Sequence, residues 1–317
     1  MNNFFLLLFE CVDINDLKTI TGGHVMLPEC RSQEYLYPVP KFDITADNIE
    51  EFADELMKYH EGFHDCFVRS ETRKHFFNYM VGQFSHLERK SIEPIAISVS
   101  GKGSVRPMQR TIADAIWHED KILHRHQDMV NQEMGDPEGV VTFDESGIVK
   151  KGGHSIGVAR QYCGSIGKVE NCQVGVYMGY ASPKGYGFLD KRIFIPEKWF
   201  TDEYEERRQK CQLPDSIHFK TKPELAAEML RDIVKHDAIS FKYILSDTLY
   251  GTSPDFIEAA EASGKIYMVS MPYDTLFWLH HPVTRQQTYK YRGEIRSKTV
   301  LDENKKKQCL SKLLPLI

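Results

Sequence analysis

Two aspartates far apart in the chain have the type and the setting for metal-dependent chemistry. Asp144 follows the apolar residues 140–143, and Asp247 follows the apolar run 243–245 and one serine. Each is expected to end a strand, where an aspartate commonly serves only as a turn former. On adjacent strands, however, the two carboxylates would repel each other unless a cation lay between them. Oxygen ligands of this kind are what Mg²⁺ prefers, so the pair predicts a divalent cation site.

The segment after Asp144 is rich in glycine and carries four spaced cations, Lys150, Lys151, Arg160 and Lys168. Cations beside a metal-binding carboxylate are suited to holding the phosphates of a nucleic acid. The glycines would let the chain pass close to such a polyanion. The formal net charge of the 317-residue chain is -5, so any nucleic-acid contact must come from a local basic patch. Residues 285–308 form one such patch, with eight cations against three carboxylates.

Cysteine usage and the apolar N-terminal stretch bear on the compartment. The seven cysteines are odd in number, irregularly spaced and free of any CxxC motif, which favours reduced thiols over a disulfide framework or a zinc ribbon. The N-terminal run FFLLLF is too short for a signal peptide or a membrane span. These features predict a cytoplasmic protein.

The periodicity of the chain changes near residue 136. Helices are expected over residues 45–60, 69–90 and 106–134, whereas short strands follow the turn signal at 136–139. A helix is expected over 221–236, where Thr221 and Glu224 form a capping box. From residue 140 the predicted order is three strands, a helix, a strand, a helix and a strand. This order predicts an α/β fold with a ribonuclease H-like mixed sheet of five strands, three antiparallel and then parallel strands with crossover helices.

Three regions follow from this pattern. Residues 1–135 are expected to be mostly helical, residues 136–275 to contain the predicted sheet, and residues 276–317 to be basic. In the fourth strand of the predicted sheet, Asp247 would reach the same end of the sheet as Asp144 in the first.

Several sequence blocks resemble the DDE transposases of bacterial insertion sequences. They are VTFDESGIVKKGGHSIGVARQYCGSIGKVENCQVGV, FIPEKWF, FKTKPELAAEML and YILSDTLYGTSPDF, in this order. The resemblance is nearest to the branch named after insertion sequence seven hundred and one, which is related to the insertion sequence four group. It covers roughly residues 70–300 and includes the upstream blocks LERKSIEPIA and RPMQRTIADAIW.

The resemblance implies DNA strand cleavage and strand transfer at transposon ends by a polynucleotidyl transferase that uses Mg²⁺ or Mn²⁺. Asp144 and Asp247 match the first two acids of the family. The resemblance further implies that residues 1–135 form an N-terminal DNA-binding region, residues 136–275 the catalytic domain, and residues 276–317 the basic start of an inserted segment. It also implies a homodimer on paired transposon ends, contacts with target DNA, and a place in the bacterial cytoplasm, associated with the nucleoid. The DNA contacts expected on this basis are Lys150, Lys151, His154, Arg160, Gln161, Lys168, Lys222 and Tyr250.

The third acid of the family has no match at the expected spacing. Tyr289 and Arg292 satisfy the first half of the Tyr-x2-Arg-x3-Glu pattern, but the next position is Arg296, and Glu294 and Glu303 are the nearby glutamates. This departure predicts a C-terminally truncated product in which strand transfer is incomplete. An alternative function is therefore a DNA-binding transposase remnant that inhibits or represses transposition. A weaker alternative is a ribonuclease H-like nuclease without a role in transposition.

Other catalytic motifs fit poorly. The sequence WHEDK at residues 117–121 lacks the second histidine of an HExxH zinc motif, so the histidines around it are expected on a solvated helix face. SGKGS at residues 100–104 lacks the upstream glycine of a phosphate-binding loop. Cys163 has no histidine fixed to it by any motif and is expected to be a packed thiol.

Overall fold

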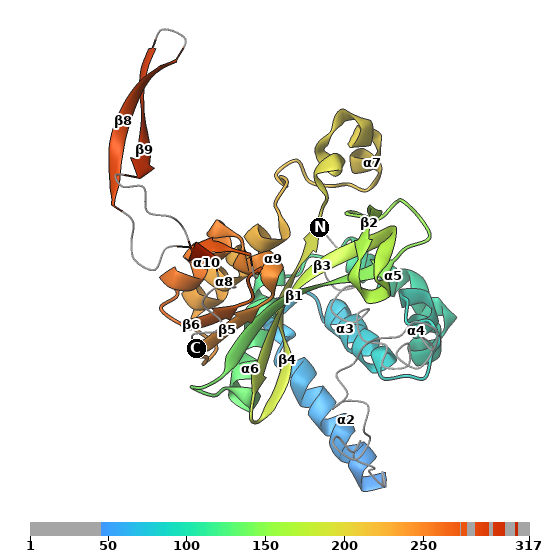
Figure 1. Ribbon diagram of the computed structural model, residues 1–317. Coiled ribbons are helices and arrows are strands. Elements are labelled where there is room, and N and C mark those ends of the chain that lie inside the picture. The colour runs from blue at the N-terminus through green and yellow to red at the C-terminus, as the bar shows by residue number, and fades with distance from the viewer. Residues whose placement is uncertain (1–45, 273, 278–282, 292–293, 302–307, 310–317) are drawn as a thin grey trace.

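The structure is a computed structural model that describes residues 46–272, 274–277, 283–291, 294–301 and 308–309. A mixed sheet lies at its centre, with helices beside it and a two-stranded hairpin that stands away from the rest (Figure 1). None of the helices in these ranges combines the length and the apolar character that crossing a bilayer requires.

The central sheet contains the strand order β4-β3-β1-β5-β6. The pairs β1–β3 and β3–β4 are antiparallel, whereas β1–β5 and β5–β6 are parallel. This arrangement fits a ribonuclease H-like fold, as the element order predicted. The strands are β1 (Val140–Val149), β2 (Ala159–Cys163), β3 (Lys168–Ser182), β4 (Gly185–Phe194), β5 (Tyr243–Ser246) and β6 (Ile266–Val269).

The predicted count of five strands is wrong, because β2 adds a sixth. The cause is the length of β3, which has 15 residues. Its first part, from Lys168 to Cys172, pairs with β2, and its remainder pairs with β4. A strand of this length can hold two shorter partners end to end along one edge.

One face of the sheet carries the main core. Alternate side chains of β1 point to opposite faces, and Val141 and Phe143 point toward α8 (Lys222–His236) and α10 (Pro254–Ala262). The ring of Phe143 meets Phe256 of α10 edge to face, with 5.2 Å between the centroids. The helix α8 begins with the predicted capping box, in which Thr221 and Glu224 satisfy each other's backbone N–H groups.

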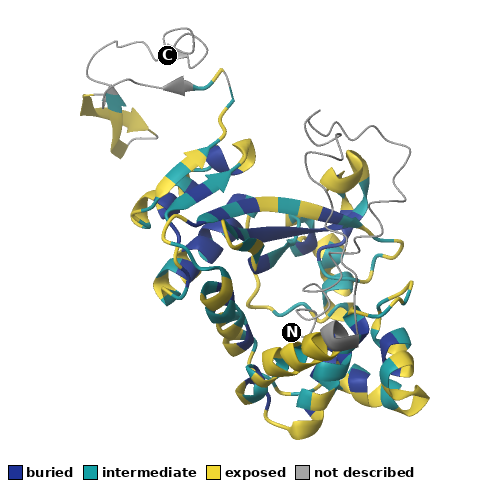
Figure 2. Ribbon diagram, turned by 90° about the horizontal axis from the view of Figure 1, so that it is seen from below, coloured by how far each residue is buried: buried dark blue, intermediate teal, exposed yellow. Residues whose placement is uncertain are grey.

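A second core lies among the helices that precede the sheet. Phe63, Phe76, Tyr79 and Ile95 are buried in it, and dark blue patches mark such residues in Figure 2. These helices are α2 (Ala46–Glu61), α3 (Ser70–Gln83), α4 (Ile92–Ser100), α5 (Val105–Ala113) and α6 (Glu119–Met134).

Helix α6 belongs to both cores. Ile122 near its start is buried in the helical core, and Val130 near its end is buried in the sheet core. Midway along the helix, Gln127 donates a hydrogen bond to the carbonyl of Leu189 in β4, at 3.3 Å. Helix α6 thus packs against both the other helices and the sheet. The domain boundaries at 135 and 275 stay predictions.

The remaining described elements follow the sheet or connect its strands. The short helix α9 (Thr248–Gly251) comes directly after β5, and α7 (Glu205–Lys210) lies between β4 and α8. Beyond β6, the strands β8 (Thr284–Tyr291) and β9 (Glu294–Leu301) form an antiparallel hairpin. The two-residue strands β7 (Leu276–Phe277) and β10 (Gln308–Cys309) pair with each other.

Candidate active site

Asp144 and Asp247 lie next to each other across neighbouring parallel strands. The β1–β5 register pairs Thr142 with Leu245 and Phe143 with Ser246, so Asp144 and Asp247 are the next residues along the two chains. Side chains of a parallel pair at the same level point to the same face. Both carboxylates therefore belong to the face opposite Val141 and Phe143, away from α8 and α10.

The predicted position of Asp144 at a strand end is wrong. Asp144 is the fifth residue of the ten-residue strand β1, which continues to Val149 along β3. The pairing of β1 with β5 does stop here, because the last β1–β5 pair is Phe143 with Ser246. Asp144 is therefore still paired with β3, whereas the pairing of β1 with β5 ends one residue before it. Asp247 is the residue directly after Ser246 in that last pair.

Like charges surround Asp144. Burial raises the pKa of its carboxyl, and the nearby carboxylates of Glu145 and Asp247 raise it further. The backbone N–H of Glu145 donates to Asp144 Oδ1 at 2.8 Å, and this bond together with the charge of Lys222 lowers the pKa in part. The net direction is upward, which means that the ionised form of Asp144 lacks a sufficient counter-charge.

Asp247 has a structural task besides any catalytic one. It is the N-cap residue of α9, and its Oδ1 accepts a hydrogen bond from the backbone N–H of Leu249 at 2.9 Å. A carboxylate at this position satisfies an orphan N–H of the helix. The bond also fixes the direction of the side chain, while its other oxygen is not engaged by any described hydrogen bond. Asp247 is therefore oriented before any ligand arrives.

Behind the two aspartates, Glu145 connects three elements. Lys222 at the start of α8 donates to Glu145 Oε1 at 2.9 Å, and Tyr250 of α9 donates to Glu145 Oε2 at 2.9 Å. Tyr250 is fully buried, and the side chains of Lys222 and Glu145 are only 20% and 23% exposed. The group Glu145–Lys222–Tyr250 is called the carboxylate clamp below. It joins β1, α8 and α9 at the level of the aspartates.

The carboxylate clamp was missed by the sequence analysis, although a signal for it exists. Glu145 continues the alternation of Val141 and Phe143, so it had to point toward the core. A carboxylate in a core register needs hydrogen-bonded partners, since an unpaired buried charge is costly. The sequence therefore demanded partners for Glu145. It did not identify Lys222 and Tyr250, which lie 77 and 105 residues further along the chain.

Two predicted DNA contacts, Lys222 and Tyr250, belong to the carboxylate clamp. Lys222 and Tyr250 each donate a hydrogen bond to Glu145, and Tyr250 is fully buried. Gln161 is also engaged, because its Nε2 donates to the carbonyls of Gly157 and Cys172 at 3.3 and 3.1 Å. The role of these three residues in DNA binding stays a prediction.

The other predicted DNA contacts lie beyond Asp144, at the same end of the sheet. Lys150 comes directly after β1, six residues from Asp144, which corresponds to about 20 Å of extended chain. Lys151, His154 and Arg160 are exposed, and the side chain of Lys168 is 65% exposed. Their role in DNA binding stays a prediction.

The residues near the expected third acid lie in or beside the hairpin. Glu294 begins β9, with a side chain that is 71% exposed and an ion pair to Arg296 at 3.1 Å. Tyr289 is in β8, whereas Arg292 and Glu303 fall outside the described residues. Within the described part of the chain, no group of three His, Cys, Asp or Glu side chains is arranged to hold a metal ion. No third metal ligand is therefore assigned to Asp144 and Asp247 among the described residues.

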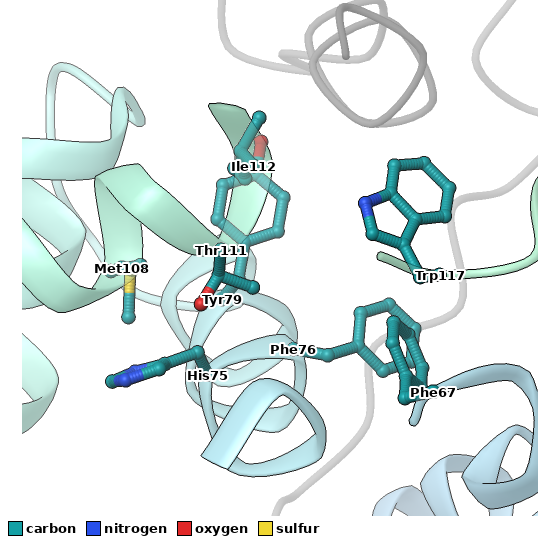
Figure 3. A pocket seen from close by; sticks show the side chains of 8 residues that line it. All are labelled: Phe67, His75, Phe76, Tyr79, Met108, Thr111, Ile112 and Trp117. Carbon is teal, nitrogen blue, oxygen red and sulfur yellow. The ribbon is translucent and has the colours of Figure 1, made fainter. Parts of the chain in front are cut away.

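Two hollows elsewhere do not compete with this site. A cavity of about 20 Å³ in the helical core is lined mainly by apolar groups, including Phe67, Met108 and Trp117 (Figure 3). It has room for about one water molecule, so it is a packing gap. A larger cleft of about 960 Å³ lies between the helical region, β4 and residues 210–220. Among its cations, Arg192, Lys210 and Lys220 are each paired with a carboxylate, and Lys191 is buried.

The donor set fits a hard divalent cation. Two carboxylates share one face and one level, and the pKa of Asp144 is raised partly by its partner's charge. A cation between them would remove that repulsion and would accept oxygen ligands of this kind. Mg²⁺ normally keeps several waters and needs only one or two protein carboxylates. Two carboxylates are thus enough protein ligands for a Mg²⁺ site.

Comparison with known proteins agrees with this geometry. The profile described as DDE superfamily endonuclease matches residues 62–313. The chain is also 26% identical over 228 residues to the probable transposase for insertion sequence element IS701 of Microchaete diplosiphon. That alignment covers 69% of this chain and 53% of the relative, so the chain spans about half the length of the curated relative it matches.

Both comparisons confirm the resemblance to DDE transposases of insertion sequences. The profile match covers the sheet, both aspartates, the carboxylate clamp and the hairpin β8–β9, together with most of the preceding helices. A match of this extent assigns the family without reliance on any single motif. The chain belongs to the DDE superfamily of endonucleases.

Proposed function

We propose that this protein acts on DNA as a transposase, by metal-dependent strand cleavage and strand transfer at transposon ends. The observation that carries the proposal is the shared level of Asp144 and Asp247 on one face of a ribonuclease H-like sheet. Membership of the DDE superfamily supports the same chemistry. The activity named for the relative is that of a probable insertion-sequence transposase.

Asp144 and Asp247 would hold Mg²⁺ or Mn²⁺. Such ions activate a water or a 3′-hydroxyl and stabilise the leaving oxygen of a phosphodiester. The chain's own residues would position the reactants. The carboxylate clamp fixes β1, α8 and α9 around the aspartates. Lys150, Lys151, Arg160 and Lys168 would hold phosphates along the strand that leads into the site.

The broader assembly belongs to the proposal as well. The helices before the sheet would contact transposon ends, and two copies would act together on paired ends in the bacterial nucleoid. A second candidate is a DNA-binding protein that occupies transposon ends without completing the reaction. This candidate follows from the departure from the Tyr-x2-Arg-x3-Glu pattern, in which Arg296 stands where the glutamate is expected.

Calorimetric titration with Mn²⁺ tests the metal site directly. The purified chain is compared with Asp144→Ala and Asp247→Ala, and Asp114→Ala serves as the control because Asp114 is an exposed aspartate at the end of α5. We expect binding by the wild type and the control, and loss of measurable binding in both site variants. Equal binding by all four proteins would place the metal elsewhere and overturn the site.

Cleavage of labelled transposon-end DNA in Mn²⁺ separates the two candidate functions. Metal-dependent nicking that Asp144→Ala abolishes supports the catalytic transposase. Metal binding and DNA binding without any nicking support the non-catalytic candidate. Hydrolysis of arbitrary DNA with no preference for transposon ends would instead favour a nuclease without a role in transposition.

A further inference from the structure

The hairpin β8–β9 is built unlike the rest of the protein. It stands apart from the sheet and the helices in Figure 1, and all eight residues of β8 are exposed. An isolated two-stranded hairpin gains little stability from its own packing. Its side chains are therefore available to a partner on both faces.

Most of the charged and aromatic side chains of the hairpin lie on one of its two faces. The register pairs Tyr289 with Arg296 and Gln287 with Lys298, so these side chains share one face with Arg285 and Tyr291. The opposite face is made mainly of threonine, serine and glutamine, with Lys290 opposite Ile295. The first face is called the basic-aromatic face below. Its members are Arg285, Gln287, Tyr289, Tyr291, Glu294, Arg296, Lys298 and Val300.

Cations lie over the rings of this face. The guanidinium of Arg296 is 5.1 Å from the ring centroid of Tyr291, and the ammonium of Lys298 is 5.4 Å from that of Tyr289. Both contacts run diagonally between the strands, where long side chains can meet. The rings stay accessible, since Tyr289 and Tyr291 are 40% and 45% exposed. Cations supported by aromatic rings at a solvent-exposed surface suit a phosphate backbone and flat sugar or base surfaces.

The charge of the hairpin contrasts with that of the whole chain. Its sequence, residues 284–301, holds five cations and one carboxylate, in a chain whose net charge is -5. The carboxylate, Glu294, is paired with Arg296. A local positive patch on an acidic protein attracts a polyanion to that place in particular. The major groove of duplex DNA admits a two-stranded β-ribbon.

We propose that the basic-aromatic face of the β8–β9 hairpin binds duplex DNA at a distance from the aspartate pair. The proposal rests on the proposed function only in taking DNA as the partner, and it needs neither metal nor cleavage. The ribbon enters a groove with Arg285, Arg296 and Lys298 toward the phosphates. Tyr289 packs against the sugar-phosphate surface.

Two lysines of the hairpin give a matched test. Lys298 lies on the basic-aromatic face and Lys290 on the opposite face, both within the same two strands and both exposed. Binding of the full chain to a fluorescently labelled random-sequence duplex is measured by anisotropy over a range of salt concentrations without metal. For each phosphate contact removed, the slope of log K against log salt falls by about 0.9. We expect that loss for Lys298→Gln and an unchanged slope for Lys290→Gln.

Two further variants extend the test. Arg296→Gln combined with Lys298→Gln should lower the slope by about 1.8. Tyr289→Ala should weaken binding several-fold without changing the slope, because it removes no charge. Thermal melts are expected to be unchanged for all of these variants, since the substituted side chains are exposed.

The outcomes separate this proposal from the proposed function. Equal effects of Lys298→Gln and Lys290→Gln, or no effect of either, would overturn the assignment of the basic-aromatic face. A hairpin effect in a protein that binds no Mn²⁺ would leave the DNA contact standing while the metal site failed.

Discussion

The same kind of ion pair occurs in two regions of this protein with different consequences. In the carboxylate clamp, Lys222 meets Glu145 at 2.9 Å, with side chains that are 20% and 23% exposed. In the hairpin, Arg296 meets Glu294 at 3.1 Å, with side chains that are 52% and 71% exposed. The distances are nearly equal, but the surroundings are not.

Burial, rather than distance, decides how much each charged pair contributes to the free energy of folding. An exposed pair is screened by water and contributes little to the free energy of folding. A buried pair costs desolvation, but removal of one partner strands the other charge and is strongly destabilising. The hairpin pair is thus free to serve binding, whereas the carboxylate clamp is committed to holding the site.

The largest expected difference comes from removing the cation of each pair. Lys222→Met should lower the free energy of unfolding by about 2–3 kcal/mol, because Glu145 would remain largely buried with one partner fewer. Arg296→Met should change it by less than about 0.5 kcal/mol. Urea unfolding followed by circular dichroism measures both. Similar losses in the two variants would refute the distinction.

A smaller difference is expected from removing one tyrosine hydroxyl in each region. Tyr250→Phe deletes a hydrogen bond to the Glu145 carboxylate and should cost about 1.5–2 kcal/mol of unfolding free energy. Tyr289→Phe changes an exposed ring and should be neutral within about 0.5 kcal/mol. The same urea titrations serve here. A neutral Tyr250→Phe variant would show that Lys222 alone satisfies Glu145.

The smallest expected effect concerns pH. The folded state raises the pKa of Asp144, so it binds the proton more tightly than the unfolded state does, and stability falls as pH rises through that pKa. Asp144→Asn removes this penalty. Without metal, the variant should melt at a higher temperature than the wild type at neutral pH, and the gap should close as the pH falls below the raised pKa. Thermal melts at several pH values give the comparison.

Added Mn²⁺ sharpens the pH experiment. It should raise the melting temperature of the wild type and leave that of Asp144→Asn nearly unchanged, because binding to the folded state alone stabilises it. A wild type that already melts higher than Asp144→Asn in the absence of metal would contradict the repulsion inferred around Asp144.

Much of the fold could be predicted because local signals agreed with each other. Thr221 and Glu224 marked the start of α8, and the structure contains their capping box. The order of strands and helices after residue 140 predicted the neighbouring positions of β1 and β5, and the two aspartates share one level there. The ends of helices were harder to predict from the sequence than their starts. The helix expected over residues 69–90 ends at Gln83, and Phe84 is exposed after it.

Other features depended on contacts between distant segments. The sixth strand arose because β3 is long enough to pair with β2 and β4 in turn. Asp144 lies in the middle of β1 because β3 continues the pairing beyond the point where β5 stops. Lys222 and Tyr250 looked like surface groups in the sequence, and only the packing of α8 and α9 against β1 turned them toward Glu145.

The sequence by itself determined which residues could do chemistry, the alternation that sends Glu145 and Asp144 to opposite faces, and the limits of the best-capped helix. These are properties of neighbouring residues, and the geometry of strands and helix ends fixes them locally. The tertiary structure decided which charges are buried together and which stay in water. That choice sets the energy of a charge, because it depends on groups that fold into place from far along the chain.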